Sequence, residues 1–315
     1  MTETNRPVLS IVIPLYNEEL VLDEMRERIT NLLNKHEFES EVILVNDGSS
    51  DSTYALAKKI CDSDGRFKLI SFSRNFGHQI AITAGMEKTS GKAVVVIDAD
   101  LQDPPELILD MLKKWEEGFH VVYGVRKKRK GESLFKRATA ALFYRMLRLM
   151  TSADIPVDTG DFRLLDRKVV EQLKNMPERS RFLRGMVSWV GFKQCKLEYV
   201  REKRFAGETK YPLKKMLAFA VDGMLSFSRI PLRLSTLLGF LCAGLSFVMI
   251  LYGLTVRAFF PAYAIPGWAS IFTASLFLGG VQLICVGILG EYIGRIYEEV
   301  KKRPLYIIDE EINFK

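Results

Sequence analysis

The stretch AVVVIDADLQDPP, residues 93–105, is the most informative part of this sequence. Its first five residues, Ala93–Ile97, form a largely β-branched apolar run, which predicts a buried strand. The run ends abruptly at Asp98-Ala99-Asp100. Pro104-Pro105 then favours the first turn of a helix, where a missing amide donor has no cost. The segment is therefore predicted to form a strand, an acidic turn and a helix.

The same alternation of strand and helix is predicted over residues 8–125. Short apolar runs alternate with segments of helical periodicity, and polar clusters separate them. Repeated units of this length are typical of a mainly parallel sheet covered by helices, so the predicted fold class is α/β. The predicted strands are 8–13, 41–45, 67–72, 93–97 and 120–125, and the predicted helices are 19–36, 53–63, 80–88 and 104–117.

Four predicted loops lie at one edge of this sheet. The carboxyl ends of parallel strands meet at one edge, and ligands bind there. Pro14, Asp47, Ser73 and Asp98 each follow a predicted strand. Neither GxGxxG nor GxxxxGK[ST] occurs at these turns, so the dinucleotide-binding and ATPase fingerprints are absent from them.

Asp98 and Asp100 are the candidate metal ligands. Two carboxylates two residues apart face one cleft only if the chain turns between them, and a cation must then offset their repulsion. Oxygen ligands suit Mg²⁺ or Mn²⁺, which bridge to substrate phosphates. The alternative is structural: an Asx turn, with Asp103 capping the next helix. Asp47 likewise fits either a hydrogen-bond acceptor for a base or ribose, or an ordinary turn residue.

The last third of the chain has a different composition, because residues 234–256 and 258–290 contain no charged side chain. The predicted spans Leu234–Val256 and Trp268–Leu289 are long enough to cross a hydrocarbon core of about 30 Å. A pair of buried helices in a soluble protein is the alternative, but charge-free runs of this length disfavour it. Basic residues flank the spans at Arg229, Arg233, Arg295, Lys301, Lys302 and Arg303, and Arg257 alone lies between them. The positive-inside rule therefore places both termini in the cytoplasm.

Two amphipathic segments precede the spans. Residues 133–150 gather apolar side chains on one helical face and basic ones on the other, which favours a helix in the bilayer interface over one packed on the domain's own core. Residues 213–227 are a second candidate. We expect a cytoplasmic domain over residues 1–228, and a membrane domain over residues 229–315 with a cytoplasmic C-terminal tail.

The overall composition agrees with this division. The 315 residues include 45 Lys and Arg against 38 Asp and Glu, a net charge of +7. Such an excess suits a membrane surface or a phosphate-rich ligand. Nucleic acid is disfavoured, because the basic residues concentrate beside the membrane-facing segments. Hydrophobic residues make up 48%, which excludes a disordered chain. The four cysteines form no CxxC pair, and residues 1–7 contain no hydrophobic signal core.

Several motifs, in order along nearly the whole chain, resemble those of known enzymes. VIPLYNEE (12–19), VNDGSSD (45–51), SRNFG (73–77) and DADLQDPP (98–105) are similar to the motifs of family 2 glycosyltransferases. TGDFR (159–163), GETKY (207–211) and GEYIGRIY (290–297) resemble the polyprenyl-phosphate glycosyltransferases. That group includes bactoprenol glucosyltransferases, dolichol-phosphate mannose synthases and the aminoarabinose transferase of lipid A modification. Two C-terminal spans fit the bactoprenol glucosyltransferase-like subgroup best. Thr209 stands where relatives often have Ser, and both residues carry a hydroxyl.

The resemblance implies a glycosyltransferase A-type domain and roles for particular residues. The residues implied in binding the nucleotide sugar are Pro14, Tyr16, Glu18, Asp47, Asp98, Ala99 and Gln102. Asp100 and Asp161 would be catalytic, and Asp100 and Asp98 would bind the divalent metal, Mg²⁺ or Mn²⁺. Arg126, Arg204 and Lys210 would bind the acceptor phosphate. From the residues alone, Asp161 also fits a helix cap near Arg167, and Arg204 and Lys210 also fit a solvated basic patch.

The implied reaction is the inverting transfer of a hexose from a nucleotide sugar to a polyprenyl phosphate at the cytoplasmic membrane. UDP-glucose and undecaprenyl phosphate are the expected substrates, and mannose or a modified arabinose is the alternative sugar. A phosphate monoester has a second pKa of about 6 and needs no strong base to ionise it. Asp161 could therefore act either as a base or as a residue that positions the acceptor. The QxxRW motif of processive polysaccharide synthases is absent, and the four aspartates argue against a non-catalytic scaffold or flippase. The subgroup also implies a homotetramer.

Overall fold

The computed structural model describes residues 7–35, 38–126, 159–200, 230–259 and 267–314. The chain divides into two compact units, one of residues 1–218 with 303–315 and one of residues 219–302. The amphipathic segments predicted at 133–150 and 213–227 lie outside the described residues, as do Arg204 and Lys210.

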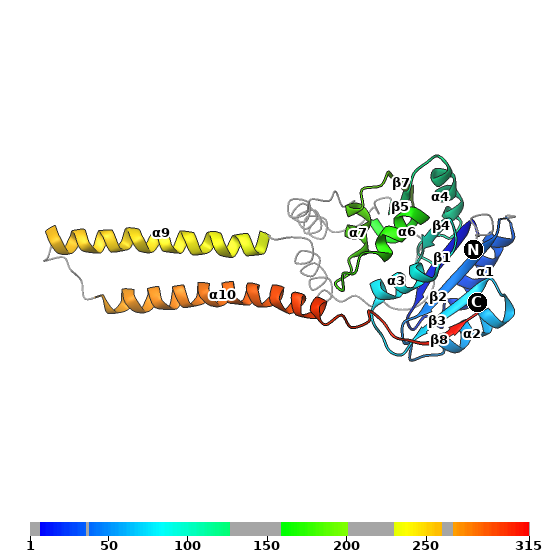
Figure 1. Cartoon of the computed structure of the whole chain (residues 1–315), viewed down its shortest axis with the longest axis horizontal. Helices are drawn as coiled ribbons and strands as arrows, with labels where there is room; N and C mark the ends of the chain where they lie inside the picture. Colours follow the sequence, from blue (N-terminus) through cyan, green and yellow to red (C-terminus); the bar gives the residue numbers. More distant parts are fainter. Residues whose placement is uncertain (1–6, 36–37, 127–158, 201–229, 260–266, 315) are drawn as a thin grey trace. The chain divides into compact units, whose positions relative to one another are not determined.

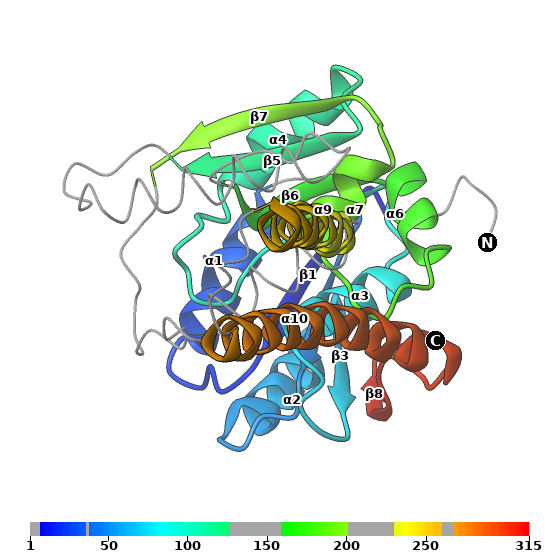
Figure 2. The ribbon, with the colours of Figure 1, turned by 90° about the vertical axis from the view of Figure 1, so that its left-hand side faces the viewer.

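The first unit contains, among its described residues, an eight-stranded sheet in the order β7-β5-β6-β4-β1-β2-β3-β8 (Figure 2). The strands are β1 (Leu9–Leu15), β2 (Ser40–Asn46), β3 (Phe67–Phe72), β4 (Ala93–Val96), β5 (Val121–Arg126), β6 (Thr159–Asp166), β7 (Gln194–Tyr199) and β8 (Ile308–Ile312). β1 to β4 are mutually parallel, β5 and β7 pair in parallel, and β6 and β8 run antiparallel to their neighbours. The mainly parallel α/β sheet is confirmed, whereas β6, β7 and β8 were not predicted.

Helices cover both faces of the sheet. α1 (Leu22–Asn34), α2 (Thr53–Ser63) and α4 (Leu107–Glu116) pack on one face around a continuous apolar core. α3 (His78–Lys88), α6 (Arg167–Lys174) and α7 (Leu183–Trp189) lie on the other face (Figure 2). All seven residues of β1 are buried, as expected for a central parallel strand. α3 approaches β1 closely at Gly85, where a Cβ would lie 2.3 Å from Val12 Cγ1.

The direction of β6 brings a distant segment to the ligand-binding edge of the sheet. β6 pairs with β4 so that Arg163 lies opposite Val96. Because the two strands are antiparallel, the first residues of β6 lie where β4 ends. This register places Asp161 beside the segment that carries Asp98.

The C-terminal tail belongs to the first unit. β8 pairs with β3 from Leu69↔Ile312 to Phe72↔Ile308, and the Ser73 N–H donates to the Ile307 carbonyl at 3.1 Å. We expected residues 229–315 to form one membrane domain. The structure instead groups residues 303–315 with the first unit, where β8 pairs with β3, which would otherwise be an edge strand with unpaired backbone groups.

The second unit contains α9 (Ile230–Phe259) and α10 (Trp268–Val300), which run side by side (Figure 1). In the described part of the chain, Leu232–Met249 and Phe277–Val300 are long and apolar enough to cross a membrane. Large apolar side chains are widely exposed on both helices, as on Phe240 and Leu283, which suits a lipid environment. The predicted spans 234–256 and 268–289 lie within these helices. Lys302, with φ +46°, adopts the left-handed conformation that commonly ends a helix.

A buried acidic side chain, Glu41, joins several segments near the amino-terminal ends of the strands, away from the candidate ligand-binding loops. Glu41 accepts hydrogen bonds from Ser10 Oγ at 2.6 Å, from Ser90 Oγ at 2.8 Å and from Lys68 Nζ at 2.7 Å. Burial alone would raise the pKa of Glu41, but these bonds outweigh it and lower the pKa below 4.5. The ionised carboxylate therefore stabilises the fold.

We predict that Glu41→Ala lowers the unfolding free energy by about 2–4 kcal/mol, because it removes several bonds to a buried charge. The folded-state pKa is depressed, so the contribution is present above pH 4.5 and is lost as the pH falls through the lower, folded-state pKa. Thermal unfolding in detergent should show a large Tm difference at pH 7 that narrows at acidic pH. Glu39→Ala, at an exposed position nearby, is the control. A Tm difference that widens on acidification would contradict this account.

Candidate active site

The chain turns sharply directly after β4. Leu101 has φ +57°, a left-handed conformation that costs a leucine roughly 1–2 kcal/mol. The Gln102 N–H donates to Asp100 Oδ1 at 3.1 Å, which closes an Asx turn. The predicted turn beside the two carboxylates is therefore present, and strain of this kind is typical of functional sites.

Asp103 is bound to the end of β7. α4 begins at Leu107, the side chain of its N-cap residue Glu106 makes no cap bond, and the buried Asp103 carboxylate accepts a hydrogen bond from the Tyr199 hydroxyl. Asp103 therefore ties the acidic turn to the neighbouring part of the sheet.

His78 lies between two of the predicted site carboxylates. Its Nε2 atom is 3.4 Å from Asp98 Oδ1 and 3.3 Å from Asp161 Oδ2. His78 is the first residue of α3. The histidine thus connects the loop that follows β4 with the start of β6.

Asp161 is held from several sides. Arg184 Nε on α7 donates to Asp161 Oδ1 at 2.9 Å, and Gln79 Nε2 on α3 donates to Oδ2 at 3.2 Å. The Leu183 N–H in turn donates to Gln79 Oε1 at 3.2 Å, so α3 and α7 are connected through the same amide. The proposed helix cap near Arg167 is wrong for Asp161, because the side chain that caps α6 is Asp166.

Charges of both signs compensate one another in this cluster. Burial alone would raise the pKa of Asp161, but Arg184, His78 and Arg163 outweigh it and hold the pKa well below its ordinary range. Burial would lower the pKa of His78, but Asp161 and Asp98 raise it to about 9. Asp161 is therefore an ionised carboxylate at neutral pH and a weak base, and His78 is a cation.

The carboxylates of the acidic turn fit a divalent metal whose remaining ligands come from elsewhere. Asp98 Oδ1 is buried and, among the described residues, accepts no hydrogen bond, although His78 Nε2 lies 3.4 Å away. Burial raises the pKa of Asp98 to about 6. Across the described residues, no group of three or more His, Cys, Asp or Glu side chains is placed to hold a metal. Two carboxylates supplemented by substrate phosphates and water are the usual Mg²⁺ environment in proteins.

Asp47 holds the loop Ser73–Gly77, which we call the β3 loop. Asp47 Oδ1 accepts from the Phe76 N–H at 2.6 Å, and Oδ2 accepts from the Gly77 N–H at 3.0 Å. The carboxylate is only 3% exposed, and burial raises its pKa. Asp47 therefore positions this loop, and direct contact with a nucleotide stays a prediction.

Gly48 allows the β3 loop to approach closely. Its φ is +63°, and a Cβ at this position would lie 2.4 Å from the Arg74 carbonyl carbon and 2.5 Å from Asn75 N. Both atoms belong to the backbone and have little freedom to move. The glycine of the VNDGSSD motif is therefore required by space as well as by conformation.

The loop after β1 meets the loop after β2. Pro14 is buried in β1 opposite Val45, whereas Tyr16 is 41% exposed. The Glu18 N–H donates to Thr53 Oγ1 at 2.8 Å, and Asn17 Oδ1 accepts from the Ser50 N–H at 2.9 Å. These loops thus form one side of the candidate site, with the half-buried Gln102 and the buried Ala99 on the acidic turn after β4.

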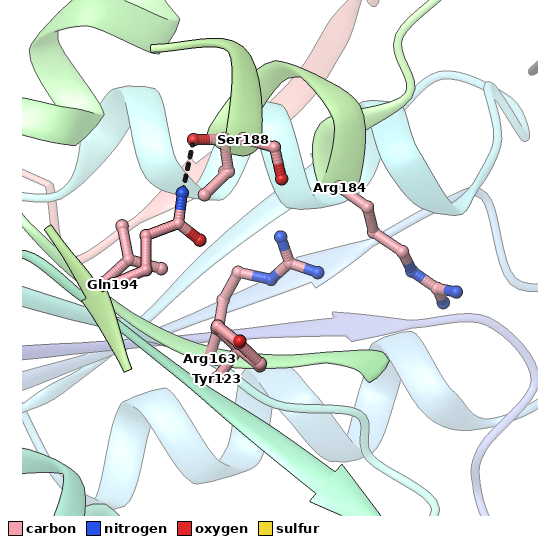
Figure 3. Close-up of a pocket in the computed structure, with 7 residues that line it drawn as sticks. Tyr123, Arg163, Arg184, Ser188 and Gln194 are labelled. Carbon is pink, nitrogen blue, oxygen red and sulfur yellow. Dashed lines mark hydrogen bonds between the residues drawn. The ribbon is translucent and has the colours of Figure 1, made fainter. Parts of the chain in front are cut away.

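A small cavity lies between α7 and strands β5, β6 and β7 (Figure 3). Arg163 points from β6 toward α7 and lines the cavity together with Arg184, Ser188, Gln194 and Tyr123. The space suits about one water molecule. Arg163 is itself buried and donates to the Gly160 carbonyl at 2.9 Å. The cavity therefore belongs to the packing that supports Asp161.

Four residues of the site were not predicted from the sequence: His78, Gln79, Arg163 and Arg184. His78 and Gln79 directly follow the SRNFG motif, and Arg163 is the last residue of TGDFR, so adjacency was the available signal. Arg184 has no local signal, because packing of α7 brings it to Asp161. Arg126 is the last residue of β5, and its side chain is outside the described part of the structure, so Arg126, Arg204 and Lys210 stay predictions.

Comparison with known proteins agrees with this architecture. Residues 10–174 match the model of glycosyl transferase family 2, and residues 230–296 match the GtrB C-terminal hairpin. The chain belongs to glycosyl transferase family 2. It is 54% identical to the uncharacterized glycosyltransferase YkcC of Bacillus subtilis, with 96% of this chain and 93% of the relative covered. It is 41% identical to the bactoprenol glucosyl transferase of Shigella phage SfII, with 95% and 97% covered. It is 40% identical to the prophage bactoprenol glucosyl transferase homolog of Escherichia coli, with 95% and 98% covered.

We predict that Gly48→Ala displaces the β3 loop, because the added Cβ collides with its backbone. Amide hydrogen exchange at Phe76 and Gly77 should become at least about tenfold faster, since their bonds to Asp47 are lost. Gly118→Ala is the matched control: its φ is +90°, but no atom lies within 4 Å of its added Cβ. Unchanged exchange in Gly48→Ala, or equal acceleration in both variants, would show that the close approach is not what fixes the loop.

Proposed function

We propose that this protein transfers a hexose from a nucleotide sugar to a polyprenyl phosphate at the cytoplasmic face of a membrane. Glucose from UDP-glucose is the proposed donor sugar, and undecaprenyl phosphate is the proposed acceptor. The observation that carries the proposal is the meeting of Asp98, Asp100 and Asp161 at one edge of the sheet, in a chain that also carries the GtrB hairpin. Relatives named bactoprenol glucosyl transferases match nearly the full length of the chain.

On the donor side, the loops after β1, β2 and β3 would hold the nucleotide. Asp98 and Asp100 would bind Mg²⁺ or Mn²⁺, which supplies charge neutralisation for the leaving diphosphate when bound. An acceptor phosphate oxygen would form the bond to the anomeric carbon from the opposite face, while the bond to the diphosphate breaks. The configuration at that carbon is thereby inverted.

Asp161 is proposed to orient the acceptor side of the site. An acceptor phosphate is largely ionised at neutral pH and has little need of a base. Asp161 is held ionised by Arg184, Gln79 and His78, which makes it a poor proton acceptor. It would instead fix these donors in place.

The acceptor phosphate would be bound by Arg126, Arg204 and Lys210. A polyprenyl chain has a transfer penalty of about 0.8 kcal/mol per buried CH₂, so its phosphate stays near the bilayer surface. Arg204 and Lys210 precede the first span in the sequence and would meet this requirement, and Arg binds phosphate in a bidentate manner. A homotetramer is part of the same proposal, and the glycines of α9 and α10, including Gly239, Gly244, Gly279 and Gly280, would permit close helix packing.

The function is tested with purified protein, undecaprenyl phosphate and a panel of radiolabelled nucleotide sugars. We expect a lipid-linked product, with UDP-glucose the best donor. Product formed best from a mannose or modified arabinose donor would favour the alternative sugars. Absence of product and of acceptor-dependent nucleoside diphosphate release with every donor would favour a scaffold or flippase.

We predict that Asp100→Ala lowers turnover at least about 100-fold in Mg²⁺ or Mn²⁺, because the metal loses a protein ligand beside the leaving diphosphate. Asp110→Ala, at an exposed helix position that pairs with Lys113, should retain normal turnover. Tm is measured for both variants so that loss of fold is recognised. Near-normal turnover of a folded Asp100→Ala protein would show that Asp100 is not a required metal ligand.

Both termini are proposed to be cytoplasmic, with residues 257–267 on the other side of the membrane. The distribution of basic residues supports this topology. The pairing of β8 with β3 supports the part of this topology that puts both ends of the hairpin on the same side, because strands of one sheet cannot lie on opposite sides of a bilayer. An impermeant thiol reagent applied to intact cells should label Ala262→Cys and leave Thr2→Cys unlabelled, in a chain whose own cysteines are replaced. The reverse labelling pattern would overturn the topology.

A further inference from the structure

The tail that follows the membrane hairpin is firmly attached to the first unit. Lys58 Nζ lies 2.8 Å from Glu310 Oε1, and the Tyr54 hydroxyl donates to the same carboxylate. Asn313 Nδ2 donates to the carbonyls of Cys61 and Phe67, both at 2.8 Å. These bonds join the tail to α2 and to the beginning of β3.

The other end of the tail contacts the base of the β3 loop. The ring of Tyr306 stacks on that of Phe72, with centroids 5.0 Å apart and planes inclined by 22°. The Tyr306 hydroxyl donates to Glu87 Oε2 on α3 at 2.5 Å. The Ser73 N–H donates to the Ile307 carbonyl, so the first residue of the loop is also bound to the tail.

The contacts continue through the β3 loop to Asp47. Phe72 packs edge-to-face on Phe76, with centroids 5.6 Å apart, and the Arg74 guanidinium lies 4.0 Å from the Phe76 centroid. The Phe76 N–H donates to Asp47 Oδ1 at 2.6 Å. Ser73, Arg74 and Asn75 are exposed, so the loop has little packing on its outer side. The stacked rings of Tyr306, Phe72 and Phe76, together with the hydrogen bond from Ser73 to Ile307, therefore hold the loop on its inner side.

We propose that Tyr306 is a positioning residue for the donor site. By stacking on Phe72 it holds Phe76 and the β3 loop in the arrangement that Asp47 requires. The segment after the membrane hairpin thus completes the nucleotide-binding side of the sheet. This proposal rests on the proposed function, in which the loops after β1, β2 and β3 hold the nucleotide.

The competing explanation is that the tail only stabilises the exposed edge of β3. The two explanations differ in which tail residues affect the donor. General stabilisation makes Glu310 as important for donor binding as Tyr306. Positioning makes Tyr306 important and Glu310 unimportant, because the Glu310 carboxylate bonds to Tyr54 and Lys58 on α2, whereas the Tyr306 ring stacks on Phe72 at the base of the β3 loop.

The test compares Tyr306→Ala, Tyr306→Phe and Glu310→Gln in the full-length protein. We expect Tyr306→Ala to raise the UDP dissociation constant, measured by calorimetry, and the donor KM by about 5- to 20-fold, with kcat and acceptor KM within about twofold of wild type. Tyr306→Phe keeps the stacked ring and should remain within about threefold of wild type. Glu310→Gln should lower Tm and leave donor binding unchanged. Equal weakening in Tyr306→Ala and Glu310→Gln, or none in Tyr306→Ala, would overturn the proposal.

Amide hydrogen exchange separates this proposal from the proposed function. Without substrate, Tyr306→Ala should speed exchange at Ser73, Phe76 and Gly77, while exchange in the centre of β2 stays unchanged. If the wild type transfers no sugar, the proposed function fails, and the exchange comparison still decides whether Tyr306 holds the loop. Should Tyr306→Ala fail to fold, Tyr306→Leu retains bulk without the aromatic stack, and the same outcomes apply to it.

Discussion

Repulsion among Asp98, Asp100 and Asp161 is the physical constraint on which the arrangement of this site depends. Buried carboxylates remain ionised only where cations or hydrogen-bond donors compensate them. His78, Arg163 and Arg184 supply that compensation around Asp161, and they come from α3, β6 and α7. The acidic turn is compensated less completely, since in the described part of the chain Asp98 Oδ1 accepts no hydrogen bond and faces His78 Nε2 at 3.4 Å. This difference separates a carboxylate with fixed partners from one suited to a metal ion.

The same constraint explains why the site combines distant parts of the chain. Parallel strands β1 to β4 bring their loops together by simple repetition, but the partners of Asp161 require the antiparallel strand β6 and the helix α7. Gln79 links these parts, because its amide contacts both Asp161 and the backbone of Leu183. The position of Asp161 therefore depends on how α3 and α7 are placed on one face of the sheet.

The relation between the membrane hairpin and the sheet follows from chain connectivity. The segments before and after α9 and α10 contribute strands to one sheet. In sequence, the hairpin is therefore an insertion within the unit that contains the sheet. The tail also covers the edge of β3, which would otherwise expose unpaired backbone groups. Both ends of the hairpin are therefore connected along the chain to the unit that contains the sheet.

The sequence by itself determined the repeating units and the ends of most early elements. The predicted bounds of α2 and β3 match the structure, because strong periodicity and flanking polar residues specify them locally. It also determined the acidic turn after β4 and the two apolar helices, since each depends on a continuous local pattern. The family resemblance supplied Asp161, but its location was not predictable from its neighbours in sequence.

Only the tertiary structure decided the placement of β6, the contacts of His78 and Arg184, and the return of the tail to β3. Each depends on pairing between segments far apart in the chain. Such pairing leaves little periodic signal in a single short segment such as Ile308–Ile312, which alternates half-buried and exposed residues at the sheet's edge. Asp47 shows the same limit: its type and position marked it as functional, but the fold decided that both oxygens bind the β3 loop. The physical reason is that local propensity specifies an element, whereas long-range packing and charge compensation specify its partners.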